Sequence, residues 1–169
     1  MKNAIIIVSV ALFSILHFNC GIYGFRGNNP PEGIKSVAVP LFIDNSGFSQ
    51  AGLKEDFTTS LKNKILSDNT FSLLDKDKSD GVLNCTINTI RDEAMVISGN
   101  EVVSKRKITI SINVEFMNMR KHKKIWERKF ENWGDYNSSN SSFSQRTEGI
   151  KLAIDKITED IINDITSNW

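Results

Sequence analysis

Cys20 is the residue of this sequence with the clearest chemical meaning, because of what precedes it. The chain starts with Met1-Lys2-Asn3 and continues as an almost uninterrupted apolar run from Ala4 to Phe18. As a helix this run would extend only about 22 Å, which is short of the roughly 30 Å hydrocarbon core of a bilayer. A charged start followed by a short apolar segment predicts a secretory signal peptide over residues 1–19.

The thiol of a cysteine directly after such a segment could accept a diacylglycerol group, as in bacterial lipoproteins. We therefore predict lipidation of Cys20, with acylation of the new N-terminus supplying the several chains that stable anchoring requires. The preceding residues, His17-Phe18-Asn19, depart from the usual pattern, which has leucine near the third position before the cysteine and a small residue directly before it. The alternative is an ordinary signal peptide followed by an incidental cysteine.

Two clusters of basic residues could bind phosphate groups of a glycolipid, or another anionic partner. The alternative is that they are the solvated ends of a strand, where charge prevents edge pairing. The clusters start 15 residues apart, which at about 3.3 Å per residue places them near opposite ends of one strand. The candidate contact residues are Lys105, Arg106 and Lys107 before that strand and Arg120, Lys121, Lys123 and Lys124 after it.

The sequence predicts neither an enzyme nor a metal or cofactor site. After removal of the signal peptide, His122 is the only histidine, and it lies among cations with no adjacent carboxylate to orient it. No cysteine and histidine cluster has zinc spacing, and no glycine-rich turn resembles a phosphate-binding loop. Cys85 alternates with Leu83 and Ile87, which predicts a small buried hydrophobe rather than a reactive thiol.

Composition predicts one domain and no nucleic-acid partner. Residues 20–169 are enough for a single domain with its own core. The full chain has 21 Lys and Arg against 20 Asp and Glu, and loss of Lys2 leaves the mature chain formally neutral, without the basic footprint of a nucleic-acid-binding protein. Glycines and prolines up to Gly33 predict a tether over residues 20–33, followed by a single α/β domain over residues 34–169.

The elements that position the basic clusters can be predicted from apolar periodicity. Alternation predicts strands at 34–42, 71–74, 82–90, 108–117 and 125–133. Apolar residues every three or four positions predict two helices, from Gly52 to Ser67 and through residues 150–165. Pro40 indicates that the first strand lies at an edge or bulges there.

This order predicts an α/β (α+β) two-layer sandwich, in which two helices pack on a mixed sheet of four to five strands. The strands on either side of residues 119–124 should form a hairpin with a basic tip. The residues predicted to face one core include Ile110, Ile112, Val114, Ile154, Ile157 and Ile161.

Blocks of sequence spread over nearly the whole mature chain are informative when taken in order. They are Cys20–Phe25, Ile34–Ser46, Leu53–Leu61, Ile108–Phe116, Ile125-Trp126-Glu127 and Asp135-Tyr136. Together they resemble the LptE family of lipopolysaccharide-assembly lipoproteins, in the form found in Bacteroidetes and related Gram-negative bacteria. The resemblance implies an outer-membrane lipoprotein on the periplasmic side, an LptD-type β-barrel partner whose lumen the chain plugs, and binding of lipopolysaccharide. It implies no reaction and no cofactor.

The segment Val37–Ser46 is also similar to the first strand of periplasmic lipoproteins of the TolB, CsgG and LpoB kind. That resemblance implies a secretion-pore subunit or an activator of peptidoglycan synthases. A ring-shaped homo-oligomer would favour the pore, stimulation of a synthase would favour the activator, and co-purification with a large β-barrel would favour lipopolysaccharide transport.

Overall fold

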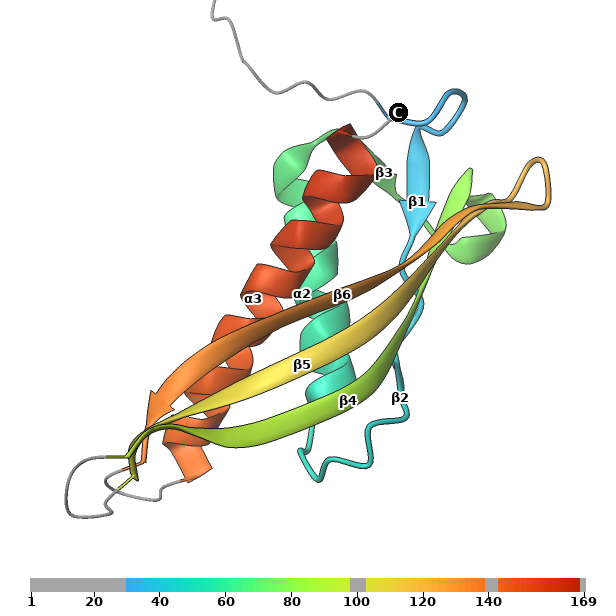
Figure 1. Ribbon diagram of the computed structural model, residues 1–169. Coiled ribbons are helices and arrows are strands. Elements are labelled where there is room, and N and C mark those ends of the chain that lie inside the picture. The colour runs from blue at the N-terminus through green and yellow to red at the C-terminus, as the bar shows by residue number, and fades with distance from the viewer. Residues whose placement is uncertain (1–29, 98–102, 139–142, 168–169) are drawn as a thin grey trace, which may run out of the picture.

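Two helices pack on one face of a sheet in the computed structural model, which describes residues 30–97, 103–138 and 143–167 (Figure 1). The helices are α2 (Leu53–Asp68) and α3 (Phe143–Ser167), and they lie side by side. The strands are β1 (Ser36–Ala38), β2 (Ile43–Asp44), β3 (Ser72–Leu73), β4 (Gly81–Ile97), β5 (Val103–Asn118) and β6 (Lys123–Asn137), with a short 3-10 helix at Lys76–Lys78. The predicted two-layer fold is confirmed. The predicted signal peptide, Cys20 and most of the predicted tether lie outside the described residues.

Within the described ranges the sheet has six strands, in the order β3-β1-β4-β5-β6, with β2 also paired to β4. The strand β1 pairs in parallel with β3 and with β4, and β2 pairs in parallel with β4. The strands β4, β5 and β6 form an antiparallel meander. The predicted strand at 34–42 is divided because Pro40 has no N–H to donate. Pairing with β4 therefore stops at Ala38 and resumes at Ile43, and β1 is an interrupted internal strand rather than an edge.

The meander strands are longer than apolar alternation predicts, with 17, 16 and 15 residues. The extension of β4 beyond Ile90 begins with three charged residues, Arg91-Asp92-Glu93, and ends with the apolar run Ala94–Ile97, so neither part shows the alternation of a half-buried strand. Its carboxylates lie opposite the first basic cluster, and Glu93 pairs with Lys107 across the ladder. Opposite charges facing each other stabilise paired strands, so the ribbon continues through this charged stretch.

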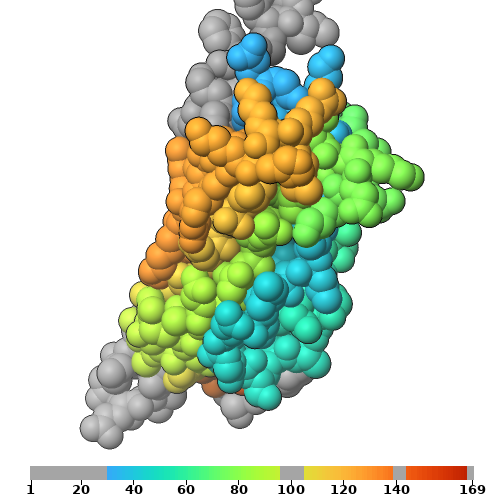
Figure 2. All heavy atoms as spheres, turned by 90° about the vertical axis from the view of Figure 1, so that its right-hand side faces the viewer, coloured from blue at the N-terminus to red at the C-terminus, as the bar shows by residue number. Residues whose placement is uncertain are grey.

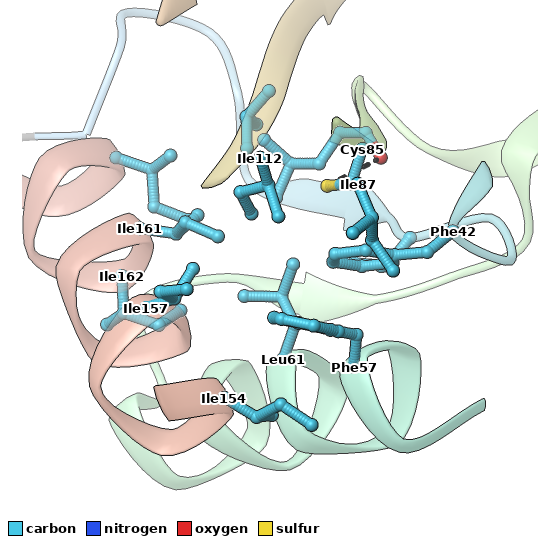
Figure 3. Packing of buried hydrophobic residues seen from close by; sticks show 14 of the residues in the cluster. Phe42, Phe57, Leu61, Cys85, Ile87, Ile112, Ile154, Ile157, Ile161 and Ile162 are labelled. Atoms are coloured by element: carbon cyan, nitrogen blue, oxygen red, sulfur yellow. Dashed lines mark hydrogen bonds between the residues drawn. The ribbon is translucent and has the colours of Figure 1, made fainter. Parts of the chain in front are cut away.

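The core lies between the helices and the sheet. Figure 3 shows Ile154, Ile157 and Ile161 of α3 directed toward Leu61 of α2 and Ile112 of β5. All six residues predicted for the core are buried, with at most 4% of each residue exposed. Cys85 is buried in the same cluster, as predicted, and burial raises the pKa of its thiol.

The backbones of β6 and α3 approach each other closely at Gly134 and Gly149. A Cβ atom added at Gly134 would lie 2.0 Å from the carbonyl oxygen of Gly149 and 3.0 Å from the backbone nitrogen of Ala153. The two backbones can meet at this distance because Gly134 carries no side chain.

Candidate functional site

The second basic cluster forms the tip of the hairpin between β5 and β6, as predicted. The turn spans Met119–His122, and Asn118 pairs with Lys123 across its base. His122 has a φ of 48°, a left-handed conformation that closes the turn. We call the residues Met119–Lys124 the basic tip.

Arg120 is held by the fold rather than left free for a ligand. Its Nε and Nη2 atoms both lie 2.6 Å from Oδ1 of Asp80. Asp80, whose side chain is only 9% exposed, also accepts hydrogen bonds from the backbone N–H groups of Lys35 and Ser36. The hydrogen bond from Lys35, more than any other contact, lowers the pKa of Asp80, so its carboxylate stays charged. Arg120 therefore fixes the basic tip against the starts of β1 and β4.

The three lysines of the basic tip differ in their partners. The Nζ atom of Lys124 lies 2.6 Å from a carboxylate oxygen of Glu127 and 3.9 Å from one of Glu115, and the hydrogen bond to Glu127 raises the pKa of Lys124. Within the described ranges no ion pair involves Lys121 or Lys123. These two ammonium groups are the cations of the basic tip that remain available to an external anion.

A hollow of about 370 Å³ lies beside the basic tip. Its lining combines the lysines with the first residues of the described chain, which are brought to the same end of the molecule (Figure 2). The lining residues are Pro31, Glu32, Asn118, Lys121, Lys123, Lys124 and Ile125. The lining has three lysines against one carboxylate, Glu32, together with the apolar side chains of Pro31 and Ile125. This excess of positive charge next to apolar groups suits the phosphate group of an amphiphilic molecule.

The first basic cluster lies at the opposite end of β5, as the strand length predicts (Figure 1). Each of its cations faces a carboxylate of the sheet: Lys105 lies 3.8 Å from Asp135, Arg106 2.8 Å from Asp92, and Lys107 4.0 Å from Glu93. The structure therefore does not combine the two clusters into one site.

Arg106 is the most firmly held cation of that first cluster. Its Nε donates to Oδ1 of Asp92, and the hydroxyl of Tyr136 donates to Oδ2 of the same carboxylate at 2.7 Å. This network ties the far ends of β4, β5 and β6 together. Sequence reasoning missed Asp92 and Asp80, which are 14 and 40 residues from their arginines. For Glu93 a signal was available, because pairing of the two neighbouring strands places this carboxylate directly opposite Lys107.

A larger hollow, of about 760 Å³, lies between α2 and α3 but has the wrong charge for a phosphate. Its acidic lining residues are Glu55, Asp56, Asp155 and Glu159. Lys64 bridges two of them, at 2.8 Å from Asp155 and 2.9 Å from Glu159, and these carboxylates raise its pKa. The basic tip is therefore the better candidate for binding an anion.

Two further findings concern the described residues alone. They contain no group of three or more histidine, cysteine, aspartate and glutamate side chains arranged to hold a metal ion. None of the described helices combines the length and the apolar character needed to cross a membrane.

Solved structures share this fold at low sequence identity. A hypothetical protein from Chlamydia trachomatis superposes with a TM-score of 0.58 at 10% identity, covering 78% of this chain and 95% of the other. A PelC dodecamer from Paraburkholderia phytofirmans gives 0.55 at 10% identity, covering 83% and 95%. Rare lipoprotein B from Shewanella oneidensis gives 0.50 at 10% identity, covering 76% and 92%. At these identities the likeness shows the fold alone.

Sequence comparison identifies the family. No curated protein sequence matches the chain. The family model described as LptE, lipopolysaccharide-assembly, matches residues 34–167, which include every helix and strand of the described structure. The chain therefore belongs to the LptE lipopolysaccharide-assembly family.

Proposed function

We propose that the mature chain is a non-enzymatic outer-membrane lipoprotein that binds an LptD-type β-barrel and contacts lipopolysaccharide on the periplasmic side. The observation that carries the proposal is the family match over residues 34–167. The polar outer face of the meander is compatible with the lumen of a barrel, since barrel interiors are polar. No substrate is turned over and no cofactor is needed.

For the contact with lipopolysaccharide we propose the basic tip. Lys121 and Lys123 have no ion pair within the described ranges, and they share a hollow with Lys124 and the apolar side chain of Ile125. A phosphorylated glycolipid presents the matching combination of anionic and apolar groups. The cations at the other end of β5, by contrast, stabilise the ribbon by pairing with its own carboxylates.

For the membrane anchor we propose a lipid on Cys20, which follows the apolar run of the signal peptide. Cys20→Ala should abolish labelling of the protein by a palmitate analogue, because no thiol would remain at the processing site. Cys85→Ala is the matched control, since Cys85 is buried in the core and should not take up lipid. Labelling that survives in Cys20→Ala would refute the anchor assignment.

The function is tested by capturing the tagged chain from detergent-solubilised outer membranes. We expect a large β-barrel protein to co-purify, and depletion of the chain to leave lipopolysaccharide short of the cell surface with the barrel misassembled. Normal barrel levels together with normal surface lipopolysaccharide after depletion would contradict the proposal.

The alternative of a secretion-pore subunit is favoured by one observation, the shared fold with the PelC dodecamer. That protein is a dodecamer, whereas a barrel plug acts as one copy per barrel. The mass of the captured complex separates the two functions. A homo-oligomer of the chain without a barrel would support the pore and overturn the lipopolysaccharide proposal.

A further inference from the structure

The first described residues are fixed beside the basic tip. Pro31 and Glu32 line the hollow that also contains Lys121, Lys123 and Lys124. The next residues are held by hydrogen bonds in which the Ile34 N–H donates to the Pro31 carbonyl at 3.1 Å and the Lys35 and Ser36 N–H groups donate to Asp80. The chain therefore leaves the domain at this end, in a fixed place.

The length of chain between Cys20 and this point limits where the membrane can be. Pro31 lies eleven positions after Cys20, and a fully extended chain of that length reaches at most about 40 Å. The cluster at Lys105–Lys107 lies about 50 Å further along β5, so of the two clusters the basic tip is the one that a lipid on Cys20 keeps near the bilayer.

Charge at this end favours an anionic surface, although one carboxylate, Glu32, lines the hollow together with the three lysines. Arg120 compensates Asp80, and Lys124 is paired with Glu127, whereas Lys121 and Lys123 have no ion pair in the described part of the chain. Basic side chains next to a lipid anchor act as a second membrane signal, because they add to the attraction that the acyl chains supply.

We infer that the basic tip docks on the anionic phospholipid head groups of the leaflet that holds the Cys20 lipid. In the cell this inference rests on the proposed anchoring at Cys20. The ammonium groups of Lys121 and Lys123 contact head-group phosphates, and the end of β5 that carries Lys105 points away from the membrane. Docking at this end fixes the orientation of the domain relative to the membrane, which a lipid anchor alone does not do.

The test uses the mature chain from residue 20 with Cys20→Ser, so that no acyl chain contributes. We expect it to sediment with vesicles of phosphatidylcholine and phosphatidylglycerol, to remain in solution with pure phosphatidylcholine, and to be released by salt. Lys121→Gln with Lys123→Gln should weaken binding to the anionic vesicles roughly 30-fold, from about fivefold for each lysine near such a surface.

The matched control is Lys105→Gln with Lys107→Gln, which removes two lysines from the other end of the same strand and should leave vesicle binding unchanged. Equal circular dichroism and melting temperatures would establish that both variants fold. Failure to bind the anionic vesicles, or equal weakening by the two double variants, would overturn the inference. Binding to purified lipopolysaccharide without binding to phospholipid vesicles would also overturn it while leaving the proposed function intact, whereas capture of no barrel would count against the function alone.

Discussion

Replacing Gly134 by alanine is expected to lower the free energy of unfolding by about 3 kcal/mol, the upper part of the usual range for overpacking. The new Cβ would lie 2.0 Å from the carbonyl oxygen of Gly149, and also 2.8 Å from the Cβ atom of Leu152. Relief requires a shift of the helix backbone, because the nearest atom belongs to α3 itself. Urea denaturation of the purified variant measures the loss.

Gly149→Ala is the informative comparison for Gly134→Ala. Its added Cβ would lie 3.0 Å from Cδ1 of Tyr136, a side-chain atom that can move slightly. Alanine also stabilises a helix by nearly 1 kcal/mol relative to glycine, so Gly149→Ala should be far less harmful. Equal effects of the two substitutions would show that the contact between α3 and β6 is looser than described here.

Truncating Ile157 to alanine is expected to cost about 2–5 kcal/mol, because it removes buried methyl groups and leaves a cavity. Ile157 is 0% exposed and faces the core between α2 and the sheet (Figure 3). The measurement is again the urea midpoint and slope. Leu152→Ala is the matched control on the same helix, because Leu152 is 47% exposed and its loss should change stability by less than about 0.5 kcal/mol. A cost for Ile157→Ala no larger than for Leu152→Ala would contradict the orientation of α3.

Sequence periodicity predicted the layers of the fold well. The helix predicted from Gly52 to Ser67 is observed at Leu53–Asp68, because one apolar stripe stays in phase over its whole length. The lengths of the meander strands were harder to predict. The strand β4 continues through Asp92 and Glu93, which form ion pairs with Arg106 and Lys107 of β5. Such a charged segment forms a strand only when its partner strand lies beside it, and the periodicity of apolar residues along the sequence does not reveal that partner.

The candidate site could likewise be predicted only in part from the sequence. Its cations could be found in the sequence, and so could their position at a hairpin tip. Which of them are available could be predicted only in part. Lys124 pairs with Glu127, three residues later in the same strand, but Arg120 pairs with Asp80, 40 residues earlier. The contribution of Pro31 and Glu32 to the hollow likewise depends on where the first strand enters the sheet. The positions of charged residues can be read from the sequence, whereas their distant ion-pair partners depend on how the strands are arranged in the fold.

The mixed topology also has a consequence for the order of folding. In the meander, Phe116 pairs with Trp126, only ten residues away, so these strands can form from local contacts. Val37 of β1 pairs with Gly81, 44 residues later, and this parallel contact requires closure of a loop that contains the whole of α2. We therefore expect β1 to add late to a preformed meander. In the export that we propose, the N-terminal segment emerges first, so β1 can complete its pairing only after β4 has followed it across the membrane.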